Sequence, residues 1–283
     1  MRAEAVVDAH KPLMHTNENS AAAIQWRSGQ LISSRFDDIY FSSADGIAES
    51  TYVFVEGNRL PERIDSRPDK SDWHILELGF GTGLNFLNTV AFFQSGKLPA
   101  RLVYSSCELY PLSPDVLEKS LETFRSLDSL VATFRPVYNS LWDCWCQNGP
   151  GWYSCYLPQF NCVLQLALMS AADMLSDLLQ PNATVNQITA AKKNQAPKLR
   201  PGPVDAIYMD GFAPAKNPAM WSFEIIENLA RLSGPGTSLA TFSAAGQLKR
   251  DLIQAGFQVQ KIPGFGRKRE MITARFLSQV TGA

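Results

Sequence analysis

Short apolar, strand-like stretches alternate with helix-like stretches over most of the chain. The strand-like stretches lie near residues 74–78, 102–107, 162–168, 204–209, 237–242, 257–262 and 270–276. The helix-like stretches lie near 84–95, 113–126, 171–180, 219–232 and 244–255. Such alternation is typical of an open sheet of parallel strands with helices on both faces. The pattern therefore predicts an α/β fold with a doubly wound, mostly parallel, seven-stranded sheet whose last two strands form a hairpin-like pair.

A glycine-rich turn follows the first predicted strand. Gly79, Gly81 and Gly83 come directly after it, and a helical stretch begins at Leu84. Glycines at this point let backbone N–H groups approach a ligand without interference from a Cβ atom. The spacing is Glu-x-Gly-x-Gly-x-Gly, which differs from the dinucleotide-binding fingerprint. A ligand-binding turn is one interpretation, and a tight connection without a ligand is the alternative.

The second predicted strand ends at Glu108. A carboxylate at the tip of this strand can accept hydrogen bonds from both hydroxyls of a ribose. The glycine turn has no Lys-Ser/Thr ending and no basic residue close by, so it offers little to a pyrophosphate or a triphosphate. S-adenosylmethionine fits these constraints, because it has a ribose, an adenine and an amino acid part but no phosphate.

Asp210 follows the buried strand at 204–209 and precedes a sharp turn, Gly211-Phe212-Ala213-Pro214. Ligands of α/β proteins bind at the carboxyl edge of the sheet, where this acid is expected to lie. Asp210 is therefore the candidate catalytic residue, and the alternative is a residue that only caps the turn. Lys216 and Asn217, in the same loop, either position a substrate or complete the loop.

Composition excludes several classes of protein. A chain of 283 residues with 45% hydrophobic content can bury a substantial core. No apolar run approaches the length of a membrane span and the amino end lacks a signal-peptide core, so we expect a cytoplasmic protein that binds no membrane. The five cysteines show no Cys-x-x-Cys spacing and there are only three histidines. Reduced thiols are therefore expected, with no metal, and Cys144 and Cys146 are a weak metal candidate.

Residues 1–70 are predicted to form a small β appendage, with strands at Phe36–Ser42 and Ser50–Glu56 closed by a turn at Gly57 and Asn58. Residues 71–283 are predicted to form the Rossmann-like domain.

Two segments interrupt this domain. Residues 127–161 contain Trp142, Trp145 and Trp152, and we expect a packed insertion too irregular for one element. An aromatic cluster of this kind belongs more often to a core than to a base-stacking site. Residues 181–203 are polar and rich in Asn and Pro, so a mobile loop is expected there.

The carboxyl-terminal part is locally basic although the formal net charge of the chain is only -1. Between residues 248 and 275 the basic residues are Lys249, Arg250, Lys261, Arg267, Lys268, Arg269 and Arg275. If the strand at 257–262 runs parallel to the rest of the sheet, its end and the cluster at 267–269 lie near the ligand edge. An anionic substrate would arrive there, and an ordinary solvated surface is the alternative.

With these motifs in this order, the chain resembles the methyltransferase domain of the MnmC family, bacterial bifunctional proteins that modify the wobble uridine of tRNA. The resemblance is carried by residues 36–42, 52–58, 79–87, 209–218 and 264–271, and so covers nearly the whole chain apart from the two insertions. It implies a class I, Rossmann-like, S-adenosylmethionine-dependent methyltransferase. The implied reaction is methylation of the primary amine of 5-aminomethyl-(2-thio)uridine in the tRNA anticodon arm.

The resemblance gives the candidate residues specific roles. Asp210 would bind the amine and help to remove a proton, directly or through water. Gly79, Gly81, Gly83 and Glu108 would bind the cofactor, and Glu49 and Tyr52 would close over it. Glu77, also a cofactor-binding candidate, would orient either the glycine turn or the amino group of the cofactor's methionine part. Phe212, Lys216 and Asn217 would contact the target nucleoside, and Lys249, Arg267, Lys268 and Arg269 would hold anticodon-arm phosphates.

This chain departs from the family pattern at two places. Family members usually carry Gly-Asp where this chain has Met169-Ser170. Adenine recognition then falls to Ser170 or to Asp173, and we favour Ser170. Trp152-Tyr153-Ser154 stands where family members often have a basic pair, which predicts a weaker phosphate contact.

Full-length family members also contain an FAD-dependent oxidoreductase domain. No second glycine fingerprint occurs in this sequence, so we expect no FAD in this chain, which is either a stand-alone relative or part of a longer protein. An oxidoreductase partner would be fused or separate. The alternatives are an aminopropyltransferase-like enzyme, a small-amine methyltransferase, or a non-catalytic tRNA-binding module.

Overall fold

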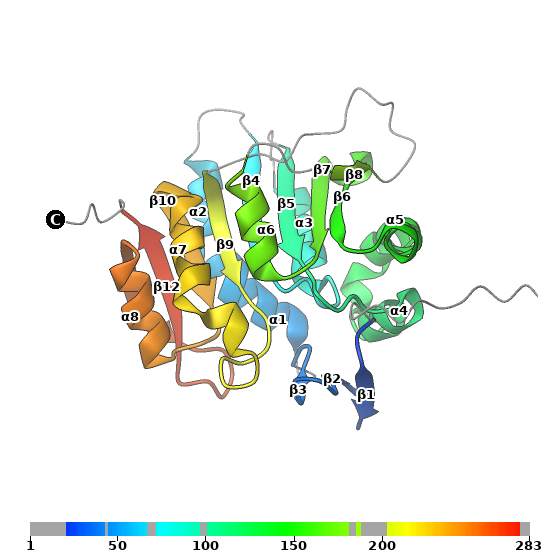
Figure 1. Cartoon of the computed structure of the whole chain (residues 1–283), viewed down its shortest axis with the longest axis horizontal. Helices are drawn as coiled ribbons and strands as arrows, with labels where there is room; N and C mark the ends of the chain where they lie inside the picture. The colour runs from blue at the N-terminus through cyan, green and yellow to red at the C-terminus, as the bar shows by residue number, and fades with distance from the viewer. Residues whose placement is uncertain are drawn as a thin grey trace, which may run out of the picture.

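A central sheet organises the computed structural model, which describes residues 21–42, 45–66, 72–96, 101–180, 185–187 and 203–277 (Figure 1). Within these residues the sheet has nine strands in the order β11-β12-β10-β9-β4-β5-β7-β6-β8. Their bounds are Trp73–Leu78 (β4), Leu102–Cys107 (β5), Gly151–Leu157 (β6), Cys162–Leu168 (β7), Val185–Gln187 (β8), Val204–Met209 (β9), Ser233–Thr241 (β10), Phe257–Pro263 (β11) and Glu270–Phe276 (β12).

The sheet is mostly parallel, as predicted. β7, β5, β4, β9 and β10 pair in parallel, whereas β12 lies antiparallel between β10 and β11. β11 therefore runs in the direction of the parallel strands, and its end reaches the same edge as theirs. All seven predicted strands form, and β6 and β8 extend the sheet beyond β7.

The segment at 127–161 is packed and forms more than one element, as expected, but it is more regular than predicted. The segment forms a long helix, Asp128–Asn148 (α5), followed by β6, which pairs antiparallel with β7. The buried residues of α5 recur at helical spacing, namely Leu130, Phe134, Tyr138, Leu141 and Trp145. The spacing was present in the sequence, but Pro136 inside the helix and the Trp-rich composition obscured it.

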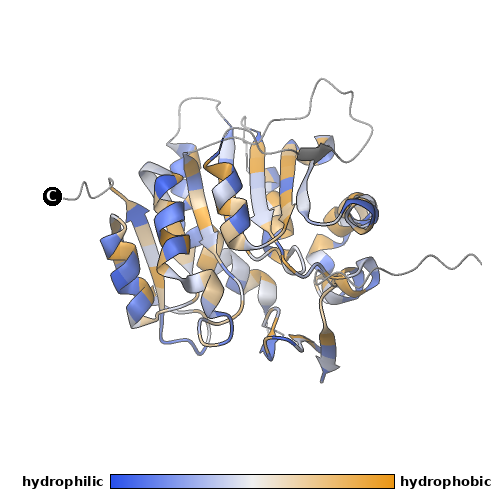
Figure 2. Cartoon of the chain, in the orientation of Figure 1, coloured by the Kyte–Doolittle hydropathy of each residue, from blue (hydrophilic) through white to orange (hydrophobic). Residues whose placement is uncertain are grey.

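Two helical layers cover the sheet. α1 (Gly46–Ser50), α3 (Leu84–Ser95) and α5 contact one another on one face, and α6 (Ala171–Leu178), α7 (Phe223–Arg231) and α8 (Gly246–Gln254) lie on the other. The remaining helical segments are α2 (Leu60–Asp65), α4 (Pro114–Leu121), η2 (Arg125–Leu127), η3 (Pro158–Phe160) and η4 (Pro218–Trp221). α7 and α8 show both hydrophilic and hydrophobic colours in Figure 2, and Ile225, Ile226 and Leu229 of α7 are buried. Each layer thus packs an apolar stripe onto the sheet.

The amino-terminal part differs from the prediction. β1 (Ile24–Arg27), β2 (Gln30–Ser33) and β3 (Asp38–Ile39) form a small antiparallel sheet, so only a short piece of the predicted strand at 36–42 is extended. The predicted strand at 50–56 is wrong, because α1 continues into a π-helix, Thr51–Glu56 (η1).

The helical conformation of residues 46–56 has one local cause and one tertiary cause. Asp45 caps α1 by accepting a hydrogen bond from the backbone N–H of Ala48 at 3.0 Å. Val53, Phe54 and Val55 are buried in succession, which a strand with one exposed face does not allow. Their burial between α3 and the sheet outweighs the β preference of this run.

Several expectations lie outside what the structure describes. The segment at 181–203 falls outside the described residues except for β8 and Pro203. The division into residues 1–70 and 71–283 stays a prediction. In the described part of the chain, no helix combines the length and the apolar character needed to cross a membrane.

Candidate active site

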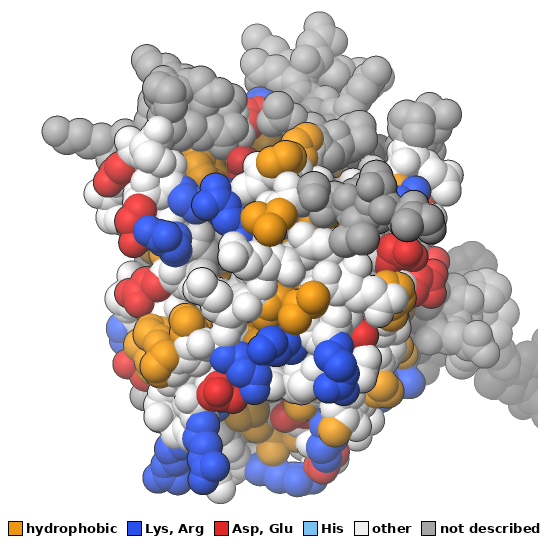
Figure 3. Space-filling model, turned by 90° about the vertical axis from the view of Figure 1, so that its left-hand side faces the viewer, with side chains coloured by type: hydrophobic (Ala, Val, Ile, Leu, Met, Phe, Trp, Pro, Cys, Tyr) orange, Lys and Arg blue, Asp and Glu red, His pale blue; other side chains and the backbone are white. Residues whose placement is uncertain are grey.

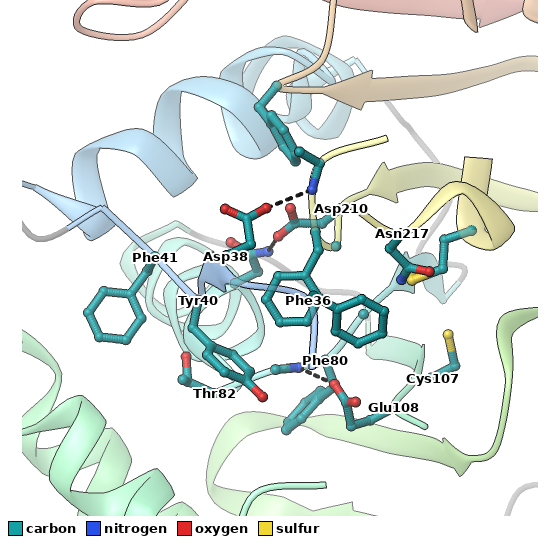
Figure 4. Close-up of a pocket in the computed structure, with 18 of the residues that line it drawn as sticks. Phe36, Asp38, Tyr40, Phe41, Phe80, Thr82, Cys107, Glu108, Asp210 and Asn217 are labelled. Atoms are coloured by element: carbon teal, nitrogen blue, oxygen red, sulfur yellow. Dashed lines mark hydrogen bonds between the residues drawn. The ribbon is translucent and has the colours of Figure 1, made fainter. Parts of the chain in front are cut away.

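A cavity of about 550 Å³ lies at the carboxyl ends of β4, β5, β7 and β9 (Figure 4). Nine of the predicted site residues line it: Glu49, Gly79, Gly81, Glu108, Ser170, Asp210, Phe212, Asn217 and Lys268. Its size is within the usual range for a site that holds a small molecule. The other seven predicted residues do not line the cavity: Glu77, Gly83, Tyr52, Lys216, Lys249, Arg267 and Arg269.

The glycine turn shapes the floor of the cavity. Gly79, Gly81 and Gly83 have φ values of +84°, +54° and +74°, in the region that side chains with a Cβ rarely adopt. A Cβ on Gly79 would lie 3.2 Å from the Cα of Gly211, so this glycine lets the turns after β4 and β9 approach each other. Gly81 faces the cavity and the ring of Tyr40.

Glu108 stands at the tip of β5 with its carboxylate held by backbone groups. Its Oε2 accepts from the N–H of Gly81 and its Oε1 from the N–H of Tyr110, both at 2.9 Å. Burial raises the pKa of Glu108, and these backbone donors oppose the rise. The carboxylate is thus fixed in direction at the cavity wall.

Asp210 is linked to a second carboxyl group through one amide. Nδ2 of Asn85, in the first turn of α3, donates to Oδ2 of Asp210 at 2.7 Å and to Oε1 of Glu77 at 3.0 Å. Burial raises the pKa of Asp210 to about 6, opposed by the backbone N–H of Gly211 and by Asn85. Asn85 also lines the cavity, and sequence reasoning missed it.

Glu77 is fully buried and lies behind the cavity wall. Burial raises its pKa to about 8, and the Ser106 hydroxyl, which donates to Oε2 at 2.7 Å, opposes the rise. Glu77 is therefore mostly a neutral acid at neutral pH. Its contact to the site runs through Asn85.

The amino-terminal sheet supplies a wall that the sequence did not reveal. Oδ2 of Asp38 accepts from the N–H of Ala213 at 2.9 Å, which ties this segment to the turn after Asp210. The ring of Phe36 stacks on Phe212 with centroids 4.7 Å apart, and Tyr40 meets Phe212 edge-on at 5.2 Å. The sequence signals were the density of aromatic and acidic residues at 36–41, which we interpreted as a strand, and the family resemblance at 36–42, which gave these residues no role in the site.

Lys216 and Asn217 separate in space. Nζ of Lys216 lies 3.1 Å from Oδ2 of Asp37, outside the cavity, and both side chains are largely exposed. This contact favours loop completion for Lys216. Asn217 lines the cavity, where it can contact a ligand.

Ser170 and Asp173, the two candidates for adenine recognition, form one hydrogen-bonded pair. Ser170 caps α6: its Oγ accepts from the N–H of Asp173 at 3.1 Å and donates to Oδ2 of Asp173 at 2.6 Å. Of the two, Ser170 lines the cavity. Asp173 therefore orients the Ser170 hydroxyl.

Of the three basic residues in the loop between β11 and β12, only Lys268 lines the cavity. Arg267 and Arg269 are exposed outside the cavity, and Lys249 lies half-buried on α8. Figure 3 shows Lys and Arg side chains gathered on the face that carries α8, β11 and β12, with hydrophobic side chains between them. Tyr52 lies against this loop and donates from its hydroxyl to the Pro263 carbonyl at 2.9 Å.

The tryptophans and cysteines belong to other parts of the fold. Trp142 and Trp145 pack together on α5 with centroids 5.1 Å apart, and Trp152 is buried and donates to Asp177. All five cysteines are free thiols. The described residues contain no group of three or more potential ligands placed to hold a metal ion.

The chain is similar to known proteins in sequence and in fold. The chain is 38% identical over 254 residues to the tRNA 5-methylaminomethyl-2-thiouridine biosynthesis bifunctional protein MnmC of Chromobacterium violaceum, a match that covers 89% of this chain and 34% of that protein. For the protein of the same name from Aeromonas hydrophila, the identity is 40%, covering 89% and 35%. The chain thus spans about a third of the length of these relatives.

A solved structure, MnmC2 from Aquifex aeolicus, superposes with a TM-score of 0.61 at 21% identity, covering 94% of this chain and 74% of that one. This likeness supports the predicted class I, Rossmann-like fold. A family model described as S-adenosyl-L-methionine-dependent methyltransferase matches residues 132–276, which include β7, β9 with Asp210, and β10 to β12. The chain therefore belongs to the S-adenosyl-L-methionine-dependent methyltransferase family.

Proposed function

We propose that this chain methylates the primary amine of 5-aminomethyl-(2-thio)uridine at the wobble position of tRNA. The observation that carries the proposal is the position of Asp210, a carboxylate with a pKa raised to about 6 in the wall of the cavity that also holds Glu108. The names of the relatives support the choice of nucleoside. A general base for an amine has to sit within reach of the reacting nitrogen, and Asp210 is available for that task.

The residues present fit S-adenosylmethionine. The Gly79 and Gly81 backbone forms a cradle that a Cβ at Gly79 would disturb, and the fixed Glu108 carboxylate can accept hydrogen bonds from two ribose hydroxyls. Ser170, which lines the cavity on the far side of β5 from Asp210, would contact the adenine. When bound, the cofactor would supply a methyl group on a positively charged sulfur: the amine lone pair would bond to the methyl carbon as the carbon–sulfur bond breaks and the sulfur leaves as a neutral thioether.

The chain's own residues have to produce that lone pair. An alkyl amine with a pKa near that of a lysine side chain, about 10.4, is mostly ammonium at neutral pH. Asp210 is mostly ionised there and accepts a proton from the ammonium, directly or through a water. The raised pKa of Asp210 is closer to the pKa of the amine than the pKa of an ordinary aspartate is, so the proton transfer is less unfavourable. Asn85 holds the receiving carboxylate in place.

The tRNA would lie along the face that carries α8, β11 and β12. Arg267, Arg269 and Lys249 would bind anticodon-arm phosphates, which predicts that binding weakens steeply as salt rises. A wobble base belongs to a single-stranded loop, so turning it into the cavity costs less than extracting a duplex base. Phe212, stacked on Phe36, offers an aromatic surface to that base.

The relatives are named bifunctional. We propose that an FAD-dependent oxidoreductase, fused to this chain or separate from it, supplies the free amine.

Mass spectrometry of the product tests the proposed function. The purified protein is incubated with S-adenosylmethionine and tRNA that bears 5-aminomethyl-2-thiouridine, and the RNA is digested to nucleosides. We expect a nucleoside heavier by one methyl group with the wild-type protein and almost none with Asp210→Asn. Turnover of free small amines with no change in the tRNA would instead indicate a small-amine methyltransferase.

A further inference from the structure

Lys268 occupies an unusual place for a lysine of a basic loop. Its Nζ lies 2.7 Å from Oε1 of Glu49 and 4.4 Å from the centroid of the Phe242 ring. All three side chains line the cavity. Asp210 lines the same cavity, where the positive charge of Lys268 lowers the pKa of Asp210 and the negative charge of Glu49 raises it.

A carboxylate and the face of an aromatic ring together form a binding site for an alkylammonium ion. The carboxylate accepts a charge-assisted hydrogen bond, and the ring attracts the cation through its quadrupole. Glu49, from α1, and Phe242, directly after β10, approach from different elements and meet at Lys268. The ion that now fills the site is the ammonium group of a primary alkyl amine, the side chain of Lys268.

A second ion pair on the same hairpin shows what distinguishes this one. Lys261 and Glu270 also lie 2.7 Å apart, but they belong to facing strands and stand outside the cavity. The Glu270 side chain is 49% exposed, whereas that of Glu49 is 17% exposed. Glu49 is thus largely removed from water inside a ligand cavity, where a carboxylate gains more from a bound cation.

We propose that Glu49 and Phe242 form a recognition site for a primary alkylammonium group, and that Lys268 occupies it as an internal mimic until the ligand displaces it. The inference rests on the proposed function, because that reaction brings two such groups to the cavity: the aminomethyl group of the target uridine and the amino group of the cofactor's methionine part. Displaced from the site, Lys268 becomes free to bind a nearby phosphate. With Lys268 gone, Glu49 and Asp210 both attract the incoming cation.

Binding to matched variants tests this site with two probes. The first probe is 5-aminomethyluridine, which carries the ammonium but no phosphate, measured in the presence of saturating S-adenosylhomocysteine, with uridine as the uncharged control. The second probe is S-adenosylmethionine, measured by calorimetry. The variants are Glu49→Gln, Phe242→Leu and Lys268→Met. Glu56→Gln, an exposed glutamate on η1, and Lys261→Met are the matched controls.

The two sources of the ammonium give different results. If the site takes the substrate, Glu49→Gln weakens 5-aminomethyluridine binding about tenfold or more, and Phe242→Leu weakens it by a smaller factor. Lys268→Met tightens it up to about fivefold, because the internal competitor is gone. Uridine binding stays unchanged. If the site takes the cofactor, the same pattern is found with S-adenosylmethionine in place of the nucleoside.

The site is refuted if Glu49→Gln behaves like Glu56→Gln and Lys268→Met behaves like Lys261→Met with both probes. That result leaves the proposed function intact as long as the wild-type protein methylates the tRNA. A pure phosphate-binding role for Lys268 also overturns the inference: Lys268→Met would then weaken tRNA binding without changing the affinity for either probe. Failure of the wild-type protein to methylate the tRNA counts against the proposed function itself.

Discussion

Replacing Asp210 by Asn should make the folded protein more stable while it removes activity. The side chains have nearly the same shape, and the Asn amide oxygen can still accept the hydrogen bond that Nδ2 of Asn85 donates at 2.7 Å. What the variant loses is a negative charge that burial disfavours. The substitution therefore separates the chemical role of the carboxylate from its packing.

The pKa of Asp210 sets the magnitude. Burial raises this pKa from 3.8 to about 6, a rise of about two pH units, and each unit corresponds to about 1.4 kcal/mol. The folded state holds the Asp210 proton more tightly than the unfolded state, so the contribution of Asp210 to stability is greatest below pH 4 and is lost as pH rises through about 6. Above pH 7 the charge costs at most about 3 kcal/mol, and less to the extent that cavity water solvates the half-buried carboxylate.

Urea denaturation of both proteins without cofactor measures this cost. We expect the free energy of unfolding of Asp210→Asn to exceed that of the wild type by about 1 to 3 kcal/mol at pH 7.5, and the two values to approach each other near pH 4. Methyl transfer should fall about 100-fold or more. Asp143→Asn, an exposed residue on α5, is the control for the loss of a charge. Lower stability of Asp210→Asn at pH 7.5 would refute desolvation as the cause of the raised pKa.

Three further variants probe the groups around Asp210. Asn85→Leu removes the donor shared by Asp210 and Glu77, so the pH at which activity rises should move upward and kcat should fall about tenfold or more, as a pH–rate profile would show. Gly79→Ala meets both a positive φ and the Gly211 backbone, and should lower the free energy of unfolding by about 1 to 3 kcal/mol in urea. Glu77→Gln removes a group whose pKa is raised to about 8, so its stability relative to the wild type should increase between pH 5 and pH 9, measured by thermal unfolding. An unchanged pH–rate profile would contradict the expectation for Asn85→Leu, and an unchanged urea midpoint that for Gly79→Ala. For Glu77→Gln, a stability difference from the wild type that does not depend on pH would do so.

The sequence predicted those parts of the site that depend on local order. β4, the glycine turn and α3 follow one another without a break, and the glycine spacing fits only a tight connection between them. The same holds for β9 and the turn that begins at Asp210. Because parallel strands end at one edge of a sheet, correct strand assignments were enough to bring Asp210 and Glu108 to one cavity.

The sequence could not predict contacts between distant residues. Asn85 and Asp210 are 125 positions apart in the sequence. Asp38 is 175 positions from Ala213, from whose backbone N–H it accepts a hydrogen bond. No periodicity links such pairs. The wrong prediction of a strand at 50–56 has a related cause. A run of β-branched and aromatic residues favours a strand, but here the surrounding fold buries consecutive side chains, which a helical turn allows. Burial of that kind is a property of the assembled fold.

Residues from the described amino-terminal part line the candidate active site, whatever domain boundary they belong to. Phe36 and Asp38 hold the turn that follows Asp210, and Glu49 meets Lys268 from the opposite end of the chain. Phe36, Asp38, Tyr40 and Glu49 line the cavity together with Asp210 and Glu108. A buried carboxylate needs a closed wall for its pKa to rise, because desolvation is the largest cause of the rise at Asp210. The described part of the segment that precedes β4 therefore helps to set the pKa of the candidate catalytic group, because Glu49 raises it, although β1, β2 and β3 form a separate sheet.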